Sequence, residues 1–279
     1  MTNATPKGKL RCTVRGCGEP LACDEHYARC PRGHSFDRAR RGYWNLLQPQ
    51  DRRSLAAGDS AGAAQARRRL AEAGHLQPLF VALAEMLDHA GLAPGSAVLD
   101  VGCGEGSLLA SVAKPRAWLA HGIDLSRPSI EMAAALWPEA TWVIANADRS
   151  LPYVDGGFDA ILSVTSRLEP REFRRVLRSA GAYLVAVAGE DDLIELRALA
   201  QGRGELRPRL AATLGAAEGS FATLLQRTIR WQLELDRAGL DELLASSYRG
   251  ARRSEGKRLA ELESAVVTMS RDVALLRAL

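Results

Sequence analysis

A glycine-rich turn near the middle of the chain restricts the fold more than any other feature. Residues 98–106 read Val-Leu-Asp-Val-Gly-Cys-Gly-Glu-Gly, so an apolar strand runs directly into glycines at positions 102, 104 and 106. This pattern is typical of a buried parallel strand that ends in a tight turn before a helix. Glycine lets the backbone approach a ligand closely, because no Cβ stands in the way. We therefore expect an α/β fold with a ligand site at this turn.

The acidic residues beside the glycines indicate the chemistry of the ligand. Asp100 and Glu105 would repel a phosphate group placed against the turn. Ser107 also stands where the dinucleotide fingerprint G-x-G-x-x-G requires its last glycine, which disfavours a nicotinamide or flavin dinucleotide. S-adenosylmethionine carries no phosphate, and its amino and sulfonium groups are positive, so it suits this turn. An ordinary loop between a strand and a helix is the alternative.

A second strand supports a nucleoside cofactor. Residues 118–124 are mostly apolar and end in Asp124, close to the spacing of roughly 20 residues at which an acid after the second strand receives ribose hydroxyls. Asp124 also precedes Ser126 and Pro128, and an acid there is an ordinary signal for the start of a helix. Taken with the glycine turn, Asp124 favours the cofactor site.

Four of the five cysteines lie within the first 30 residues. Cys12-x4-Cys17 and Cys30-x3-His34 have the spacing of two ligand turns around a tetrahedral zinc ion. The odd number of cysteines and the absence of a secretion signal disfavour disulfides. We expect Zn²⁺ to be held by Cys12, Cys17, Cys30 and His34, with Cys23 replacing Cys12 if the first turn is arranged differently.

Basic and aromatic residues alternate directly after the cysteines. Residues 1–75 carry 14 Lys and Arg against 7 Asp and Glu, although the net charge of the whole chain is only +4. Arg38, Arg40 and Arg41 lie among three aromatic residues, which is typical of a surface that binds unpaired RNA. The aromatic rings could instead pack against the small zinc module. Both interpretations are compatible if the rings are buried in the module and the arginines are exposed on its surface.

No apolar run approaches the length of a membrane span, and the polar residues 1–9 lack the apolar core of a signal peptide. We therefore expect a cytoplasmic protein that does not associate with membranes.

Several motifs together resemble one bacterial enzyme family. They are Cys-x3-His followed by Ser-Phe-Asp (35–37), Gly-Tyr-Trp-Asn-Leu-Leu (42–47), Gly-Asp-Ser (58–60), Gln-Ala-Arg-Arg (65–68), Ala-Gly-His-Leu-Gln-Pro-Leu (73–79) and the glycine turn. The chain resembles the 23S ribosomal RNA guanine-N1 methyltransferases, the large-subunit methyltransferase A enzymes, which include macrolide-resistance members. The resemblance is specific from Cys12 to Asp124 and looser afterwards.

The resemblance implies a class I S-adenosylmethionine-dependent methyltransferase with a Rossmann-like, mostly parallel seven-stranded sheet and a small N-terminal zinc ribbon. Further strands are expected at 141–145, 158–164, 182–188, 223–235 and 266–276, and a helix at 170–179. We divide the chain into a zinc-binding RNA-recognition head (1–50), a helical linker and cofactor lid (51–90) and the methyltransferase domain (91–279).

The implied reaction is in-line methyl transfer to N1 of a guanine in a hairpin loop of 23S ribosomal RNA. A homodimer whose two heads act on one RNA is a further expectation. The residues expected to bind S-adenosylmethionine are Asp100, Gly102, Gly104, Glu105, Gly106, Asp124, Leu125, Asn146, Ala147 and Asp192. By the resemblance, Asp192 lies near the methionine end of the cofactor. No general base stands out among Asp148, Ser163, Thr165 and Glu169.

The chain departs from the family in two places that bear on function. The family usually has two residues between its first two cysteines, and this chain has four. Residues 165–170, Thr-Ser-Arg-Leu-Glu-Pro, replace an aromatic-Ala-Pro segment where the target base should enter. Two alternative functions remain. The first is a small-molecule methyltransferase, although such an enzyme would not need the zinc head. The second is a catalytically weakened zinc-ribbon RNA-binding homologue, although such a protein would not need the intact glycine turn.

Overall fold

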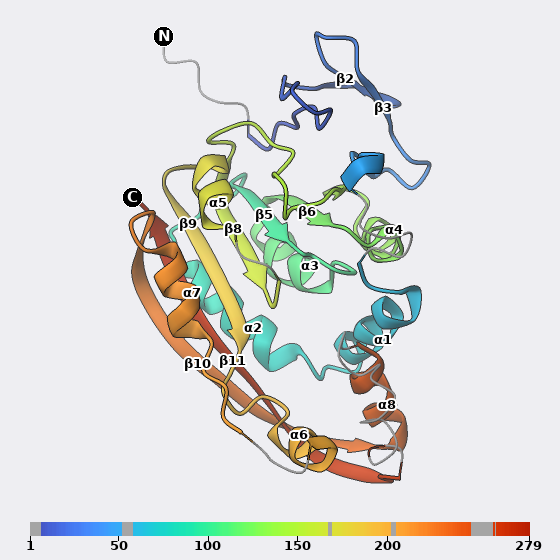
Figure 1. Cartoon of the computed structure of the whole chain (residues 1–279), viewed down its shortest axis with the longest axis vertical. Helices are drawn as coiled ribbons and strands as arrows, with labels where there is room; N and C mark the ends of the chain where they lie inside the picture. The colour runs from blue at the N-terminus through green and yellow to red at the C-terminus, as the bar shows by residue number, and fades with distance from the viewer. Residues whose placement is uncertain (1–6, 52–57, 167–168, 202–204, 247–258, 260) are drawn as a thin grey trace.

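The computed structural model describes residues 7–51, 58–166, 169–201, 205–246, 259 and 261–279. One sheet of eight strands forms the centre of the body, in the order β10-β11-β9-β8-β5-β6-β7-β4 (Figure 1). The parallel strands of the body are β5 (Ala97–Val101), β6 (Leu119–Asp124), β7 (Thr141–Ile144), β8 (Phe158–Val164) and β9 (Leu177–Ala188). Their carboxyl ends meet at one edge of the sheet, where ligands bind in folds of this class.

The antiparallel end of the sheet is a long pair of strands. β11 (Ser264–Ala278) pairs with both β9 and β10 (Phe221–Asp236), and Figure 1 shows β10 and β11 as a curved ribbon along one side of the molecule. The five parallel strands together with β10 and β11 confirm the predicted seven-stranded, mostly parallel sheet.

Helices cover both faces of the sheet, as the apolar runs of its buried strands require. α2 (Gln77–Asp88), α3 (Ser107–Ala113) and α4 (Arg127–Leu136) pack in one apolar core, and α5 (Pro170–Val176) and α7 (Leu210–Ala217) pack in a second. Short 3-10 turns lie at Pro49–Asp51 and Lys114–Arg116. No helix among the described residues is long and apolar enough to cross a bilayer.

A third, smaller core lies where the long strand pair extends past β9. α1 (Ala61–Glu72), α6 (Ile194–Gln201) and α8 (Arg237–Ser246) contribute leucines to it, and Met269 of β11 lies in the same cluster. α1 and α8 are further joined by two hydrogen bonds from the Arg69 guanidinium to the Glu242 carboxylate. These elements form one wall of the cavity described below.

One boundary differs from the prediction by more than two residues. The helix expected over 170–179 ends at Val176, and β9 begins at Leu177, five residues before the expected strand. Leu177 is buried, has extended backbone angles and pairs with Phe158. This tertiary pairing of the segment overrides its helical pattern.

The N-terminal head is a small antiparallel sheet of β1 (Ala22–Cys23), β2 (Tyr27–Arg29) and β3 (Ser35–Asp37). The aromatic rings that follow the cysteines are buried, and Arg38, Arg40 and Arg41 are exposed. β4 (Trp44–Asn45), which lies within the predicted head (1–50), pairs in parallel with β7 and adds the eighth strand to the body sheet.

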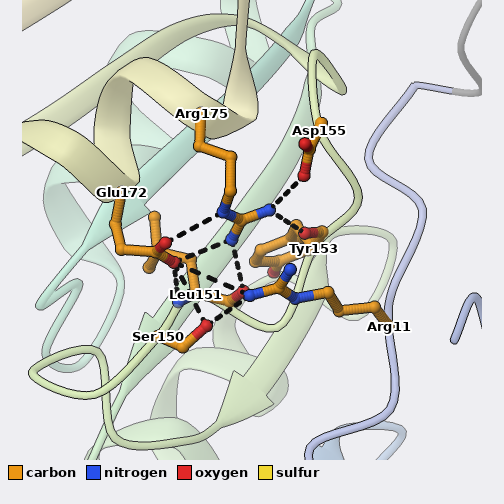
Figure 2. A network of polar contacts seen from close by, with 7 residues as sticks. All are labelled: Arg11, Ser150, Leu151, Tyr153, Asp155, Glu172 and Arg175. Atoms are coloured by element: carbon orange, nitrogen blue, oxygen red, sulfur yellow. Dashed lines mark hydrogen bonds and ion pairs between the residues drawn. The ribbon is translucent and has the colours of Figure 1, made fainter. Parts of the chain in front are cut away.

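A polar network fixes the other side of the head to the body. The Arg175 guanidinium binds both oxygens of the Glu172 carboxylate, the carbonyls of Leu151 and Tyr153, and Asp155. Arg11, the residue before Cys12, donates to Ser150, and its Nη2 lies 3.8 Å from Glu172 Oε2 (Figure 2). The head is therefore docked by an ion-pair network on one side and by a shared sheet edge on the other.

Candidate functional site

The carboxyl ends of the parallel strands open into a cavity of about 1180 Å³. It is lined by nine of the ten residues predicted to bind the cofactor, namely Asp100, Gly102, Gly104, Glu105, Asp124, Leu125, Asn146, Ala147 and Asp192. Gly106 is not part of the lining. A Cβ at Gly106 would lie 2.9 Å or less from Trp142 and Ala133, so this glycine allows α3 to pack on the core.

Asp124 links the ends of two neighbouring strands. Its Oδ2 accepts a hydrogen bond from the Gly104 backbone N–H at 2.9 Å, and its Oδ1 accepts one from the Ser126 N–H at 2.7 Å. Each carboxylate oxygen has more than one acceptor position. Asp124 can therefore hold the turn in place and still accept hydrogen bonds from the hydroxyl groups of a ligand.

The side of the cavity that carries the glycine turn concentrates negative charge, with Asp100 and Glu105 buried. Burial, followed by the charges of Asp124 and Glu105, raises the pKa of Asp100 to about 7. Burial also raises the pKa values of Glu105 and Asp124, although hydrogen bonds to each carboxylate oppose the shift. Buried carboxylates at close range are stabilised by a cation. The site thus fits a positively charged ligand such as S-adenosylmethionine and disfavours a phosphate.

Protein side chains occupy the space beside the other two glycines of the turn. A Cβ on Gly102 would lie 2.5 Å from the Cβ of Ser166, and one on Gly104 would lie 3.0 Å from Nη1 of Arg67. Both glycines have positive φ angles, 76° and 55°. They therefore allow close approach of two other segments of the chain, which the sequence did not reveal.

The predicted lid contributes directly to the cavity. Asp59 and Arg67 both line it, and Arg67 Nη2 binds Asp59 Oδ2 at 2.7 Å and the carbonyl of Ser246 in α8 at 3.1 Å. The Ser126 hydroxyl donates to the Asp59 carbonyl at 2.7 Å. These contacts hold the start of α1 against the side of the cavity that carries the glycine turn.

Asn146 and Asp192 are both held in place by the protein. Asn146 is buried, and its Oδ1 accepts from the Asp148 backbone N–H at 3.1 Å. Asp192 accepts from the backbone N–H of Ser270 at 2.9 Å and is paired with the Arg271 guanidinium. Asp192 is thus an ion-paired acid at the cavity wall.

The segment that departs from the family borders the cavity. Thr165, Ser166 and Glu169 line it, whereas residues 167–168 lie outside the described part of the chain. The Ser166 hydroxyl donates to the Val101 carbonyl at 2.7 Å, which fixes the segment against the glycine turn. Ser163 is buried and hydrogen-bonded to Ser166, and it is not part of the lining.

Sequence reasoning missed four arginines in the cavity wall: Arg197, Arg207, Arg209 and Arg271. The concentration of arginines between α6 and α7 was a usable signal, but no spacing rule connects that segment to the glycine turn. Only the folded chain places them in one cavity.

The predicted zinc ligands come together in the head. One ligand atom from each of Cys12, Cys17, Cys30 and His34 lies within 4.8 Å of the others. The Cys17 and Cys30 sulfurs are 3.8 Å apart, about the separation expected for two thiolates at 2.3 Å from a tetrahedral zinc ion. Cys23 is exposed on β1 and lies outside this group.

Two known families match parts of this chain. The "RlmA, N-terminal" zinc-ribbon family matches residues 10–55, and the "Methyltransferase domain" family matches residues 98–185. The two matches cover the head and the parallel strands that carry the glycine turn.

Among individual proteins, a "23S rRNA (guanine(748)-N(1))-methyltransferase" from Streptomyces fradiae is 34% identical over 91% of this chain and 90% of its own length. "Methyltransferase GfsG" from Streptomyces halstedii is 32% identical over 62% of this chain and 61% of its own. A chain in the solved complex of the Haloferax volcanii Trm112 methyltransferase activator with a methyltransferase superposes with a TM-score of 0.50 at 18% identity, covering 79% of this chain and 98% of that one. This structural likeness concerns the fold alone.

Proposed function

The chain belongs to the 23S rRNA (guanine-N1)-methyltransferase family, and from this membership we propose that it methylates N1 of a guanine in a hairpin loop of 23S ribosomal RNA. The observation that carries the proposal is the presence, in one chain, of an acid-lined glycine-turn cavity and a docked head with a Cys₃His cluster. The cavity suits a positively charged methyl donor, and the head supplies exposed arginines for RNA.

The residues proposed to hold S-adenosylmethionine follow from the chemistry of the cavity wall. Asp124 accepts the ribose hydroxyl protons, while Asp100 and Glu105 supply negative charge for the positive groups of the ligand. Asn146 and Ala147, which line the cavity, would border the adenine, and Asp192 would lie toward the methionine end. When bound, S-adenosylmethionine supplies an already activated methyl group, so the protein chiefly has to align the reactants and remove a proton.

We propose Glu169 as the group that takes the N1 proton of guanine. Of the four candidate bases, Ser163 is buried away from the cavity and Asp148 is engaged within the protein. Thr165 lines the cavity, but a hydroxyl is a poor base. Glu169 lines the cavity, and within the described residues its carboxylate makes no hydrogen bond or ion pair. A carboxylate can also accept from N1–H and the 2-amino group together, which would favour guanine over adenine.

The head is proposed to bind zinc through Cys12, Cys17, Cys30 and His34 and to hold the RNA near the cavity. Because β4 of the head pairs with the body sheet and Arg11 of the head joins the body's Glu172 network, RNA bound to the head would have a defined position relative to the cavity. We place the reaction in the cytoplasm, where ribosomal RNA is found. Two copies acting on one RNA is a further proposal, which sedimentation of the purified protein with and without RNA would test.

The reaction is tested with 23S rRNA that lacks the modification and labelled S-adenosylmethionine. A methyl group on N1 blocks Watson–Crick pairing, so primer extension should stop at a single guanine. Absence of rRNA labelling, with turnover of a small molecule instead, would contradict the proposed substrate. Failure of calorimetry to detect S-adenosylmethionine binding would contradict the activity itself.

The role of Glu169 is tested with Glu169→Gln, using Glu139→Gln on the body surface as the control. Glu169→Gln should lower kcat at neutral pH while the Kd for S-adenosylmethionine is unchanged, and the remaining activity should rise as the pH increases and hydroxide replaces the base. Wild-type kcat in Glu169→Gln would remove Glu169 from the mechanism.

A further inference from the structure

The charges that line the cavity are separated into two groups. Acidic residues gather at the ends of β5 and β6, where the glycine turn lies. The arginines Arg197, Arg207 and Arg209 follow β9, which lies two strands away from β5 in the sheet, and Arg271 is on the neighbouring strand β11. The positive wall therefore lies on the side of the cavity away from the glycine turn, and it meets the proposed cofactor residues only at Asp192.

Two of these arginines are used to build the wall itself. Arg271 is paired with Asp192. Arg197, in α6, donates to the backbone carbonyls of Asp192 at 2.9 Å, Glu190 at 3.0 Å and Glu205. It therefore joins the residues that precede α6 to the residues that follow it. Their guanidinium groups are already committed to partners in the protein.

Arg207 is also engaged within the protein, and its backbone N–H donates to the Glu190 carbonyl at 3.0 Å. Arg209 differs from the other three. It is the partly buried residue before the first turn of α7, and in the part of the chain that the structure describes no hydrogen bond or ion pair engages its guanidinium. The fold thus presents one uncommitted guanidinium to the cavity.

An anion in this position would relieve repulsion between like charges. Burial lowers the pKa of Arg197, and the charges of Arg207 and Arg209 lower it further, while the charges of Asp192 and Asp191 oppose the shift. These arginines are therefore close enough to repel one another. A phosphate group is the natural partner, because its oxygens match the planar fork of a guanidinium.

We propose that Arg209 binds a phosphate group of the RNA beside the guanine that enters the cavity. The proposal rests on the proposed function, since a flipped or unpaired guanine brings its own backbone phosphates to the cavity wall. S-adenosylmethionine has no phosphate, and its one anionic group is the methionine carboxylate, so an unchanged Kd for S-adenosylmethionine in the Arg209 variants is required if Arg209 acts on the RNA alone. This contact selects a nucleotide over a free base or other small molecule and positions N1 relative to Glu169.

The test uses the full-length protein with three substitutions that grade the charge: Arg209→Lys, Arg209→Gln and Arg209→Glu. Arg227→Gln is the control, because Arg227 is exposed on β10, is paired with Glu85 and does not line the cavity. For Arg209→Gln we expect kcat/KM for 23S rRNA to fall about tenfold, as for the removal of one charge-assisted hydrogen bond. The slope of log affinity for RNA against log salt should become shallower by about 0.7.

The graded series separates phosphate binding from a structural role. Activity should fall in the order Arg, Lys, Gln, Glu, while the Kd for S-adenosylmethionine and the unfolding midpoint stay at wild-type values. Equal loss in all three variants with a lowered unfolding midpoint would show that Arg209 is structural and would overturn the proposal. Wild-type activity and salt slope in Arg209→Gln would overturn it as well.

A second measurement keeps this inference separate from the proposed function. In the presence of S-adenosylhomocysteine, the wild type should bind guanosine 5′-monophosphate more tightly than guanosine, and Arg209→Gln should remove the difference. If the wild type methylates no rRNA but shows this preference, the proposed function fails and the phosphate site stands. If the wild type shows no preference, or Arg209→Gln retains it, the phosphate site is overturned.

Discussion

The carboxylate of Asp124 accepts a hydrogen bond from the backbone N–H of Gly104 at 2.9 Å. An acid at the end of β6 therefore holds the turn that follows β5, and it does so with one of the two oxygens proposed to bind the ribose. The second oxygen holds the start of α4 through the Ser126 N–H. The shape of the turn and the proposed ribose contact thus depend on the same side chain.

Asp124→Ala should weaken S-adenosylmethionine binding at least tenfold. Two charge-assisted hydrogen bonds of roughly 1.5 to 3 kcal/mol each would be removed from the complex. The free protein should also lose stability, because two partly buried N–H groups are left without an acceptor, at about 1 to 3 kcal/mol each. Calorimetry and denaturant unfolding measure the two effects, with Asp88→Ala, a surface ion-pair residue, as the control. An unchanged Kd would mean that the ribose does not bind there.

Gly102→Ala should be more destabilising than Gly104→Ala. Both substitutions place an alanine at positive φ, which costs roughly 1 to 2 kcal/mol. Only the alanine at 102 also meets a close, fixed neighbour, Ser166 Cβ at 2.5 Å, whereas the one at 104 meets the movable end of Arg67. The free energy of unfolding measures the difference, and adding Ser166→Gly to Gly102→Ala should restore part of the loss. Equal effects of the two single substitutions would contradict the packing described here.

His121 should make the protein sensitive to acid. It is partly buried edge-on against the rings of Tyr153 and Phe158, with its Nδ1 buried, and this burial lowers its pKa to about 4 from an ordinary 6.5. The unfolded chain therefore binds a proton that the folded chain excludes, and stability falls as the pH drops from about 6.5 to 4. The full loss is about 3 kcal/mol.

His121→Phe keeps an aromatic ring and removes the titration. The difference in unfolding free energy between wild type and His121→Phe should therefore change by about 3 kcal/mol between pH 7 and pH 4, in favour of the variant at low pH. Measuring this difference cancels the other titrating groups, including Asp100, whose raised pKa acts in the opposite direction. A difference that is constant with pH would show that His121 has the same pKa in the folded and unfolded states.

The purified protein should contain one zinc ion per chain. Cys30→Ser should lose the metal and destabilise the head, because a module of this size has little core of its own. Cys23→Ser should keep one zinc, since the Cys23 side chain is exposed and outside the ligand group. Metal analysis by mass spectrometry distinguishes the two variants. Loss of zinc from Cys23→Ser, or a folded wild type without zinc, would refute the ligand assignment.

The sequence was sufficient where a local pattern determines the structure. The apolar strand before Gly102 and the strand that ends at Asp124 were predicted because burial on both faces leaves a continuous apolar run. The cysteine spacing likewise predicted the cluster in the head, because ligand turns are short and local.

The sequence was insufficient where the site depends on contacts between distant segments. Ser166 packs on Gly102 across more than 60 residues, and Arg67 reaches both Gly104 and α8. No periodicity connects these positions. The cavity wall at Arg209 likewise depends on the tertiary placement of α7, which has almost no polar residues to reveal a function.

The head arginines should divide into one structural residue and two that bind RNA. Arg38 donates to the Gly42 carbonyl at 3.0 Å and lies 5.5 Å from the centre of the Trp44 ring, so it supports the turn before β4. Arg40 and Arg41 are exposed, with no hydrogen bond or ion pair to other described residues. Replacing both by glutamine should weaken RNA binding and make its dependence on log salt shallower by about 0.7 for each phosphate that is no longer neutralised.

Arg38→Gln is the matched comparison for this pair. It should lower the stability of the head, and S-adenosylmethionine binding should be unchanged in every variant, because the cofactor lies in the body and has no phosphate for these arginines to meet. RNA affinities in filter binding at several salt concentrations provide the measurement. If the Arg40→Gln/Arg41→Gln protein binds RNA with wild-type affinity and slope, these arginines are only a solvated surface, and RNA must be held by the cavity wall and other parts of the body.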